Sequence, residues 1–411
     1  MTADPSTVAT TPERKGETPA DRFPIERFRA AMEGRDAVAA MELFTDDCVI
    51  RPMGTDFIKF TGKETNTRLV AAVLSCFDVF RYVGEELRTD DMIALEMDLV
   101  LRENPPQHLD GLDILKINEE GKCYEMVVQG RPQLAQTLFT GKVALALRPH
   151  LGWFRRLLLT VLMPPLELSQ KLAGRLGGKL VHDATPNAPM QDPRGRSDKV
   201  HPARASEVGA GAASGNGASA RSNGSTPASR FPVAEWREAM EARDPERALQ
   251  YFTDDCLLRP VGTDFIRFQG KDTAKTLLDC VLSVPEKWTY TVEAHTEDTV
   301  AVFVRIEFDG LVMDACDLLR INEEGKAYEM FLVSRPQMPV AIFTGKVGKN
   351  LARKVGFLRW LLVSVLVWPL EVVQRAAGPF GAWLIEPACP GSPRRVRRWE
   401  TPDRDSVAAG I

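Results

Sequence analysis

The sequence predicts an α+β fold that occurs twice, with each copy forming a curved antiparallel sheet wrapped by three helices. The first observation is an internal repeat, because residues 22–75 and 230–283 are identical at more than half of their positions. The second is the order of patterns in each copy, in which segments of helical periodicity precede segments that read as strands. The third is a shared hairpin sequence, DILKINEEGK at 113–122 and DLLRINEEGK at 317–326. A long repeat of this kind indicates two copies of one domain.

Three helices are predicted at the start of each copy. In the first copy, one helix covers about 24–34, where apolar residues recur at helical spacing. A second covers about 36–45 and begins after Asp36, whose side chain can cap its N-terminus. A strand from Cys48 to Pro52 follows, and the third helix begins after Gly62. The second copy repeats this order, so the same elements are expected there.

Four strands complete each predicted copy. In the first copy they are expected at about 78–89, 91–102, 108–118 and 122–131. A tight turn joins the last two, and Gly121 supplies the positive φ that such a turn requires. The pentapeptide FTGKV follows the last strand in both copies and is expected to mark the start of a helix.

Composition divides the chain into two domains with connecting segments. A stretch rich in Gly, Ala and Ser cannot bury a core and is typical of a flexible linker. The expected order is a disordered tail (1–21), a first domain with an apolar helical appendage (22–183), a linker (184–229), a second domain with its appendage (230–386) and a second disordered tail (387–411).

Charge and cysteine content narrow the function classes. The net charge of −4 gives no reason to expect a nucleic-acid partner. Seven cysteines in 411 residues do not form a disulfide framework, and the polar N-terminus has no apolar stretch of a secretory signal. No CxxC occurs, and the five histidines fall at non-equivalent positions of the repeat, so neither a metal nor another cofactor is expected. A cytoplasmic location is expected, with membrane association as a further expectation.

An apolar appendage follows each predicted sheet, at 143–173 and 347–377. Each contains an apolar run, Leu157 to Leu166 and Trp360 to Leu370, which is interrupted by proline and preceded by basic residues. A membrane span needs about 20 apolar residues, so neither run is long enough alone. Basic residues beside an apolar run are typical of a helix that lies in a membrane interface. Packing on the domains, interfacial contact and a span all stay open.

The order RFRAAMEGRDAVAAMELFTDDCVIRPMG, GK, DILKINEEGK and VVQGRP resembles the nuclear transport factor 2-like cone fold, which includes ketosteroid isomerases and SnoaL-like cyclases. The resemblance covers about 23–135 and 231–339. It implies two cone-shaped sheets, each with a pocket for a small molecule. It also implies that the two domains pack as an intrachain pseudo-dimer, because relatives of this fold often pair through their sheets. Fold alone does not fix function, because this fold hosts enzymes, carriers and assembly modules.

The isomerase resemblance is incomplete at two catalytic positions. The oxyanion tyrosine of the first helix is replaced by Phe28 and Trp236, and neither side chain carries a phenolic hydroxyl. The general-base position before Pro-x-Gly holds Arg51 and Arg259. Arginine cannot act as a base at neutral pH. Isomerase chemistry of that type is therefore not expected.

The third catalytic position is kept as Asp113 and Asp317, eight residues before the hairpin glycine. Strand alternation places Asp113 on the same face as Leu115 and Ile117, so the carboxyl group is expected to point into the cone. An isolated buried carboxylate is costly unless it is protonated or paired, and the arginine before each Pro-x-Gly is the expected partner. Each aspartate is a candidate acid, base or polar anchor. A structural role, in which it caps the pleat or bonds neighbouring backbone, stays open.

The function expected from these patterns is the binding of a small apolar molecule, such as a lipid, sterol or polyketide, in the two cones. A SnoaL-like cyclase or isomerase that uses the two aspartates is the second possibility, and a non-catalytic interaction module is the third. The residues expected to line the pockets are Phe28, Phe44, Arg51, Met97, Leu115 and Val127 in the first cone and Trp236, Phe252, Arg259, Val304, Leu319 and Phe331 in the second.

Overall fold

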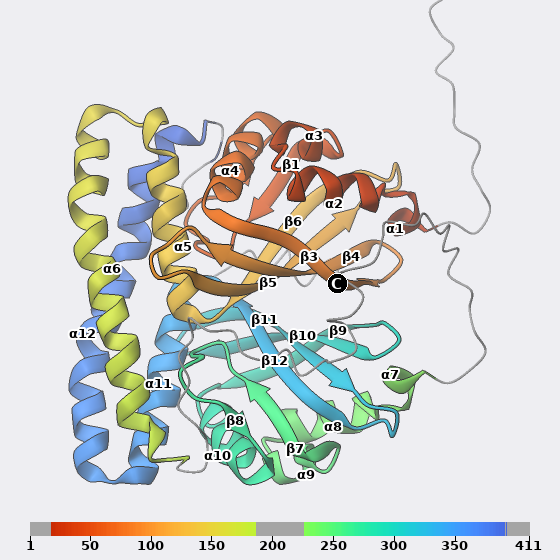
Figure 1. Cartoon of the computed structure of the whole chain (residues 1–411), viewed down its shortest axis with the longest axis vertical. Coiled ribbons are helices and arrows are strands. Elements are labelled where there is room, and N and C mark those ends of the chain that lie inside the picture. The colour runs from red at the N-terminus through yellow and green to blue at the C-terminus, as the bar shows by residue number, and fades with distance from the viewer. Residues whose placement is uncertain (1–17, 186–225, 391, 393–411) are drawn as a thin grey trace, which may run out of the picture.

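The structure, a computed structural model, describes residues 18–185, 226–390 and 392. Two similar halves lie one above the other in Figure 1, and long helices run along one side of both. Most of the predicted linker and much of the two predicted tails lie outside the described residues. The short helix at Pro227–Arg230 begins inside the segment that the sequence assigned to the linker. The short helix at Pro19–Arg22 begins inside the segment that the sequence assigned to the first tail.

The first half contains the predicted helices and strands in the predicted order. Its elements are α1 (Pro19–Arg22), α2 (Ile25–Glu33), α3 (Ala37–Met41), β1 (Phe44–Arg51), β2 (Phe60–Thr61), α4 (Lys63–Ser75), β3 (Phe77–Arg88), β4 (Met92–Leu101), β5 (Gln107–Ile117), β6 (Cys123–Arg131), α5 (Gln133–Ala146), a 3-10 turn (Arg148–His150) and α6 (Trp153–His182).

The second half repeats this order. Its elements are α7 (Pro227–Arg230), α8 (Val233–Glu241), α9 (Pro245–Leu249), β7 (Phe252–Arg259), β8 (Phe268–Gln269), α10 (Lys271–Leu282), β9 (Lys287–His295), β10 (Thr299–Phe308), β11 (Leu311–Ile321), β12 (Ala327–Arg335), α11 (Gln337–Val355), α12 (Phe357–Ile385) and a 3-10 turn (Glu386–Ala388).

Three local predictions differ from the structure. The second helix ends at Met41 instead of 45, and the first strand begins at Phe44 instead of Cys48. β1 pairs with β6 at Phe44 and again only from Val49, so an irregularity between them breaks the alternation by which strands are recognised. The FTGKV pentapeptide lies within α5 and α11 and does not start a helix, because these helices begin directly after the proline that follows β6 or β12.

The strands form one continuous sheet across both halves. Within each half the strands are antiparallel, in the orders β3-β4-β5-β6 and β9-β10-β11-β12, and β1 or β7 adds in parallel at β6 or β12. β6 and β12 pair antiparallel through Gly130 and Ser334. Each half has one apolar core built from its helices and strands. A third apolar cluster lies between the halves, where it includes Leu112, Ile114 and Phe331.

Two buried arginines reach from one half into the other. Arg131 at the end of β6 forms an ion pair with Asp264 of the second half, and Arg335 at the end of β12 forms one with Asp56 of the first half. Each of the two arginine side chains is at most 2% exposed. The backbone bonds around these arginines are also reciprocal, because Gln133 N donates to Val261 O (2.8 Å) and Gln337 N donates to Met53 O (2.9 Å).

The helical layer is also shared between the halves. α5 and α11 continue from the last strand of each sheet, and α6 and α12 lie outside them (Figure 1). The two outer helices are antiparallel, because Arg155 near the start of α6 lies over Trp383 near the end of α12, at 4.5 Å. Arg359 near the start of α12 donates to the carbonyl oxygen of Leu180 at the end of α6 (3.2 Å). Each outer helix therefore begins on its own half and ends on the other.

Candidate functional site

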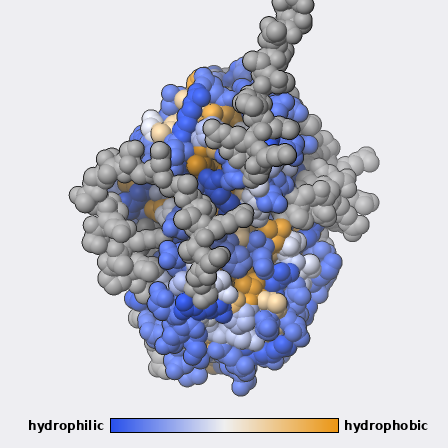
Figure 2. Space-filling model, turned by 90° about the vertical axis from the view of Figure 1, so that its right-hand side faces the viewer, coloured by the Kyte–Doolittle hydropathy of each residue, from blue (hydrophilic) through white to orange (hydrophobic). Residues whose placement is uncertain are grey.

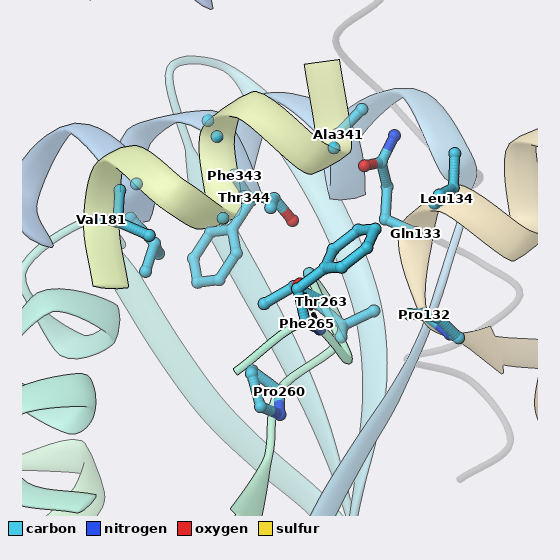
Figure 3. Close-up of a pocket in the computed structure, with 18 of the residues that line it drawn as sticks. Pro132, Gln133, Leu134, Val181, Pro260, Thr263, Phe265, Ala341, Phe343 and Thr344 are labelled. Atoms are coloured by element: carbon cyan, nitrogen blue, oxygen red, sulfur yellow. Dashed lines mark hydrogen bonds between the residues drawn. The ribbon is translucent and has the colours of Figure 1, made fainter. Parts of the chain in front are cut away.

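A pocket of about 200 Å³ lies at the end of the second cone, beneath the helical layer. Its walls come from the loop after β7, from α5 and α11, and from the two outer helices. In Figure 3 the ring of Phe265 projects from the loop toward α6, with Thr263 beside it and Phe343 on the neighbouring helix. Most of the lining surface is apolar, as expected for a small-molecule pocket with a few polar groups.

A second pocket of about 150 Å³ lies at the equivalent end of the first cone. The loop after β1, α4, α5 and the outer helices line it, with Thr55, Phe139, Thr140 and Met163 among the lining residues. The chain therefore has two related pockets, one for each copy of the repeat. We call them the end pockets.

Each end pocket is roofed by a helix from the opposite half. The C-terminal part of α6 covers the pocket of the second cone through Gln170, Gly174 and Gly178, and the C-terminal part of α12 covers that of the first through Gly378. The loop phenylalanines pack on these glycines. A Cβ at Gly178 would lie 3.2 Å from the Cβ of Phe265, and one at Gly378 would lie within 2.4 Å of the ring of Phe57. A larger residue at Gly378 would therefore displace that ring.

Two polar atoms in the pocket of the second cone have no partner among the described residues. They are Nε2 of Gln170, a residue only 6% exposed, and Oγ1 of Thr344. A buried polar group without a partner costs about 1–3 kcal/mol, so a ligand oxygen that meets these atoms would recover that free energy. The pocket therefore suits an apolar molecule that carries a hydroxyl or carbonyl group.

A buried tyrosine–aspartate pair lies inside each cone. The Tyr82 hydroxyl donates to Oδ2 of Asp113 at 2.6 Å, and the Tyr290 hydroxyl donates to Oδ2 of Asp317 at 2.9 Å. Both aspartates are at most 1% exposed, and the other carboxyl oxygen of each has no partner in the described structure. Burial raises the pKa of each aspartate to about 7, although the hydrogen bond from the tyrosine acts to lower it. Each carboxyl group can thus hold or release a proton near neutral pH.

The two arginines at the general-base position bind other carboxylates than these aspartates. Arg51 forms a buried ion pair with Glu125, which Lys116 also contacts at 3.1 Å. Burial acts to raise the pKa of Glu125, but attraction to the lysine and the arginine outweighs it and lowers that pKa. Arg259 lies 3.5 Å from Glu329. The prediction that these arginines pair with Asp113 and Asp317 is therefore wrong. The hydrogen-bond partners of the two aspartates are Tyr82 and Tyr290.

The structure places the residues expected to line the cones mainly in packed cores. Phe28, Phe44, Met97 and Leu115 belong to the core of the first half, and Trp236, Phe252, Val304 and Leu319 belong to the core of the second. Phe331 lies in the cluster between the halves. Arg51, Val127 and Val304 line a smaller space of about 40 Å³ between the two halves. None of the predicted lining residues contributes to either end pocket.

Sequence reasoning missed the tyrosines and the end-pocket loops, although the repeat contained both signals. Tyr82 and Tyr290 are separated by 208 residues, the offset of the first repeated segment, but the strands around them share little sequence. Phe57 and Phe265 lie in the repeated GTDFI, and their role depends on glycines of α12 and α6 that are more than 80 residues distant in sequence. In the described parts of the chain, no group of three or more His, Cys, Asp or Glu residues could hold a metal ion.

Comparison with known proteins identifies the repeated domain. Residues 25–126 and 233–330 each match the SnoaL-like domain family. No curated protein matches the chain.

Three solved structures are each similar to less than a third of the chain. A Silicibacter pomeroyi protein with a cystatin-like fold is 22% identical, with 29% of this chain and 81% of that chain covered and a TM-score of 0.27. A steroid Δ-isomerase from Pseudomonas aeruginosa is 18% identical, with 30% and 88% covered and a TM-score of 0.26. A Mycobacterium tuberculosis protein in complex with estradiol-17β-hemisuccinate is 21% identical, with 26% and 92% covered and a TM-score of 0.23. The repeated match and the architecture of both halves show that residues 25–126 and 233–330 are SnoaL-like domains in tandem, with the nuclear transport factor 2-like α+β fold.

Proposed function

We propose that the protein binds a small apolar molecule in its two end pockets, at a membrane surface that the outer helices contact. The observation that carries the proposal is the pair of apolar pockets at equivalent ends of the two cones, each roofed by the opposite half. The two halves then work as an intrachain pseudo-dimer, because neither pocket is complete without a helix from the other half. The unpartnered atoms of Gln170 and Thr344 favour a ligand with one hydroxyl or carbonyl oxygen.

Filling the pockets one at a time tests this proposal. A Cβ at Gly348, which lines the pocket of the second cone, meets no heavy atom within 4 Å, and the same holds at Gly381 beside the other pocket. Leucine also forms helices better than glycine, so neither Gly348→Leu nor Gly381→Leu should unfold the protein. Each variant should weaken one of two binding sites for a fluorescent sterol or a polyene fatty acid by roughly 10-fold or more.

Each variant serves as the control for the other pocket. We expect two sites in the unmodified protein, one site in each single variant and none in the double variant, measured by fluorescence titration and native mass spectrometry. A double variant that still binds two probe molecules with unchanged affinity would show that the end pockets are not the sites.

Gln170→Leu tests the polar contact of the ligand. This change removes the unpartnered amide and keeps the volume of the side chain similar. Binding of a sterol with a hydroxyl group to the pocket of the second cone should weaken by about 5- to 10-fold, because one hydrogen bond is lost. Binding of the matching hydrocarbon without the hydroxyl should not weaken. Equal losses for both molecules would mean that Gln170 acts only through packing.

A catalytic role of the cones is the second candidate. It is favoured by the buried tyrosine–aspartate pairs, whose free carboxyl oxygens and raised pKa suit proton transfer near neutral pH. The end pockets do not reach these pairs, so a substrate would have to enter the cone itself. Turnover of a polyketide or steroid substrate that is lost in Asp113→Asn and Asp317→Asn, and kept in the two leucine variants, would favour this candidate over the end pockets.

A further inference from the structure

The outer surface of α12 is entirely apolar. Its most exposed side chains include Phe357, Val365 and Trp368, which are 74%, 63% and 67% exposed. The exposed residues of this helix are Phe357, Leu358, Leu361, Leu362, Val365, Leu366, Trp368, Pro369, Val372, Val373, Ala376 and Phe380. Soluble monomers rarely expose so large a contiguous apolar surface, so this face is expected to have a partner.

The outer surface of α6 extends this apolar face. Trp153 is 76% exposed, and Leu157, Val161, Leu168 and Leu172 are each at least 52% exposed. No acidic residue is exposed among the described side chains of this helix. Because α6 and α12 lie side by side and antiparallel, their exposed residues form one surface, which we call the outer face (Figure 1). Each helix has about 30 residues, so the outer face is about 45 Å long. The opposite side of the molecule is mainly hydrophilic (Figure 2).

Most of the exposed charges around the outer face are positive. Arg156 is exposed near one end of the face, and Arg175, Lys179 and Arg353 are exposed near the other. The acidic side chains of the two helices point inward. Glu167 lies near α5, where its Oε1 is 3.4 Å from a Cβ placed at Gly141, and the equivalent glutamate of α12 lines an end pocket. Positive charge at the rim of an apolar face is the pattern of proteins that bind anionic bilayers.

The inner faces of the two helices show how the protein would lie on a bilayer. In α6, Leu159, Gln170 and Val181 are buried at steps of 11 residues, which is three helical turns, so one side of the helix is covered by protein along its whole length. α12 is covered in the same way at Val363 and Gln374. By length and composition, Phe357–Ala388 could cross a membrane. If α12 spanned the membrane, it would lose its contacts with both cones, and the buried Gln374 would face lipid. A helix parallel to the membrane surface keeps its contacts with the cones.

We infer that the outer face is a docking surface for an anionic phospholipid bilayer, with α6 and α12 lying parallel to the membrane and their apolar side chains inserted among the acyl chains. This inference specifies the membrane contact of the proposed function, and it does not depend on which ligand fills the end pockets. Both helices take part, because both contribute exposed apolar residues to the outer face. The roofs of the two end pockets then lie directly against the lipid, from which an apolar molecule can enter.

Co-sedimentation with vesicles tests the docking surface. The full chain should bind phosphatidylcholine vesicles that contain phosphatidylglycerol, and bind them more weakly in high salt. Val365→Glu with Trp368→Glu should weaken this binding by on the order of 10-fold or more, because two charged groups would enter the acyl region. Val38→Glu is the matched control, since Val38 has the same exposed fraction as Val365, 63%, but lies on α3. It should leave vesicle binding unchanged.

Charge-reversal variants measure how much electrostatic attraction contributes to vesicle binding. Arg175→Glu, Lys179→Glu and Arg353→Glu should each weaken binding to phosphatidylglycerol vesicles by roughly 5-fold and reduce its salt dependence. None of these changes should alter sterol binding in the absence of vesicles, so loss of docking and loss of ligand binding are distinguishable.

Two results would overturn the inference that the outer face docks on a membrane. Absence of vesicle binding by a monomeric full chain at low salt would be one. The other is a stable dimer that does not bind vesicles and that dissociates in the Val365→Glu, Trp368→Glu variant, since the occupant of the outer face would then be a second copy of the chain.

Fluorescence quenching tests the orientation of the helices on the membrane. Quenching of Trp368 fluorescence by lipids brominated at shallow acyl positions, compared with the Trp368→Phe protein, should exceed quenching by lipids brominated near the bilayer centre. Equal or stronger quenching from the centre would contradict the parallel orientation.

Discussion

Arg131→Ala should lower the free energy of unfolding by about 3–5 kcal/mol, because it leaves buried carboxylates without their cation. The Arg131 side chain is fully buried. It lies 2.8 Å from Asp110 of its own half and also pairs with Asp264 of the other half. Chemical denaturation in urea measures the change. Arg335→Ala should have a similar effect, because Arg335 makes the equivalent contacts with Asp314 and Asp56.

An exposed ion pair provides the control for this prediction. Arg102 lies 3.0 Å from Asp78, and both side chains are more than half exposed. Arg102→Ala should therefore change the free energy of unfolding by less than about 1 kcal/mol. The double variant Arg131→Ala, Arg335→Ala should also separate unfolding into two transitions, since the reciprocal ion pairs between the halves are lost. An Arg131→Ala protein as stable as the Arg102→Ala protein would show that these pairs do not hold the halves together.

Much of the fold could be predicted from the sequence because the repeat and the strand patterns are local signals. The four strands of the first sheet appear within two residues of their predicted bounds, and Gly121 has the predicted positive φ of 73°. Asp113 is buried together with Leu115 and Ile117, as strand alternation predicted. Each of these results depends on contacts between neighbouring segments of the chain.

The site could not be predicted to the same extent because it depends on contacts between distant segments. The predicted cone linings are apolar residues that the sequence marks as buried, but burial alone does not distinguish a pocket wall from a packed core. Phe28, for example, packs 6.0 Å from the ring of Tyr82 and lines no end pocket. The end pockets arise where α6 and α12 cross to the opposite half, and no local pattern reports such a crossing. The buried Gln170 was therefore missed within an apparently simple apolar appendage.

The buried aspartates should make the protein less stable as pH rises from about 4 to 7. The pKa of Asp113 is raised from 3.8 to about 7 by burial, and that of Asp317 is raised equally. Between these values the folded state keeps a proton that the unfolded state has lost, so raising the pH favours unfolding. The effect is complete above about pH 7, where it is on the order of 4 kcal/mol for each group. Thermal unfolding measured across this pH range should show the decline.

Asp113→Asn and Asp317→Asn should remove this decline, because an amide stays neutral at every pH in the range. At pH 8 each variant should be more stable than the unmodified protein, whereas at pH 4 the difference should be small. Glu120→Gln is the control, because Glu120 lies at an exposed position in the turn between β5 and β6. Its pH profile should match that of the unmodified protein. An unmodified protein without a stability change between pH 4 and 7 would contradict the raised pKa.

Tyr82→Phe distinguishes a titrating carboxyl group from a general effect of charge in the core. The hydrogen bond from Tyr82 lowers the pKa of Asp113, so its removal should raise that pKa further and move the loss of stability to higher pH. A buried acid that destabilises the protein at neutral pH, and that occurs in both copies, is a residue whose retention packing does not explain. If the two asparagine variants gain stability and still bind the apolar probes in the end pockets, the aspartates belong to a second, chemical role inside the cones. If probe binding is lost with the carboxyl groups, the cones and the end pockets form one site.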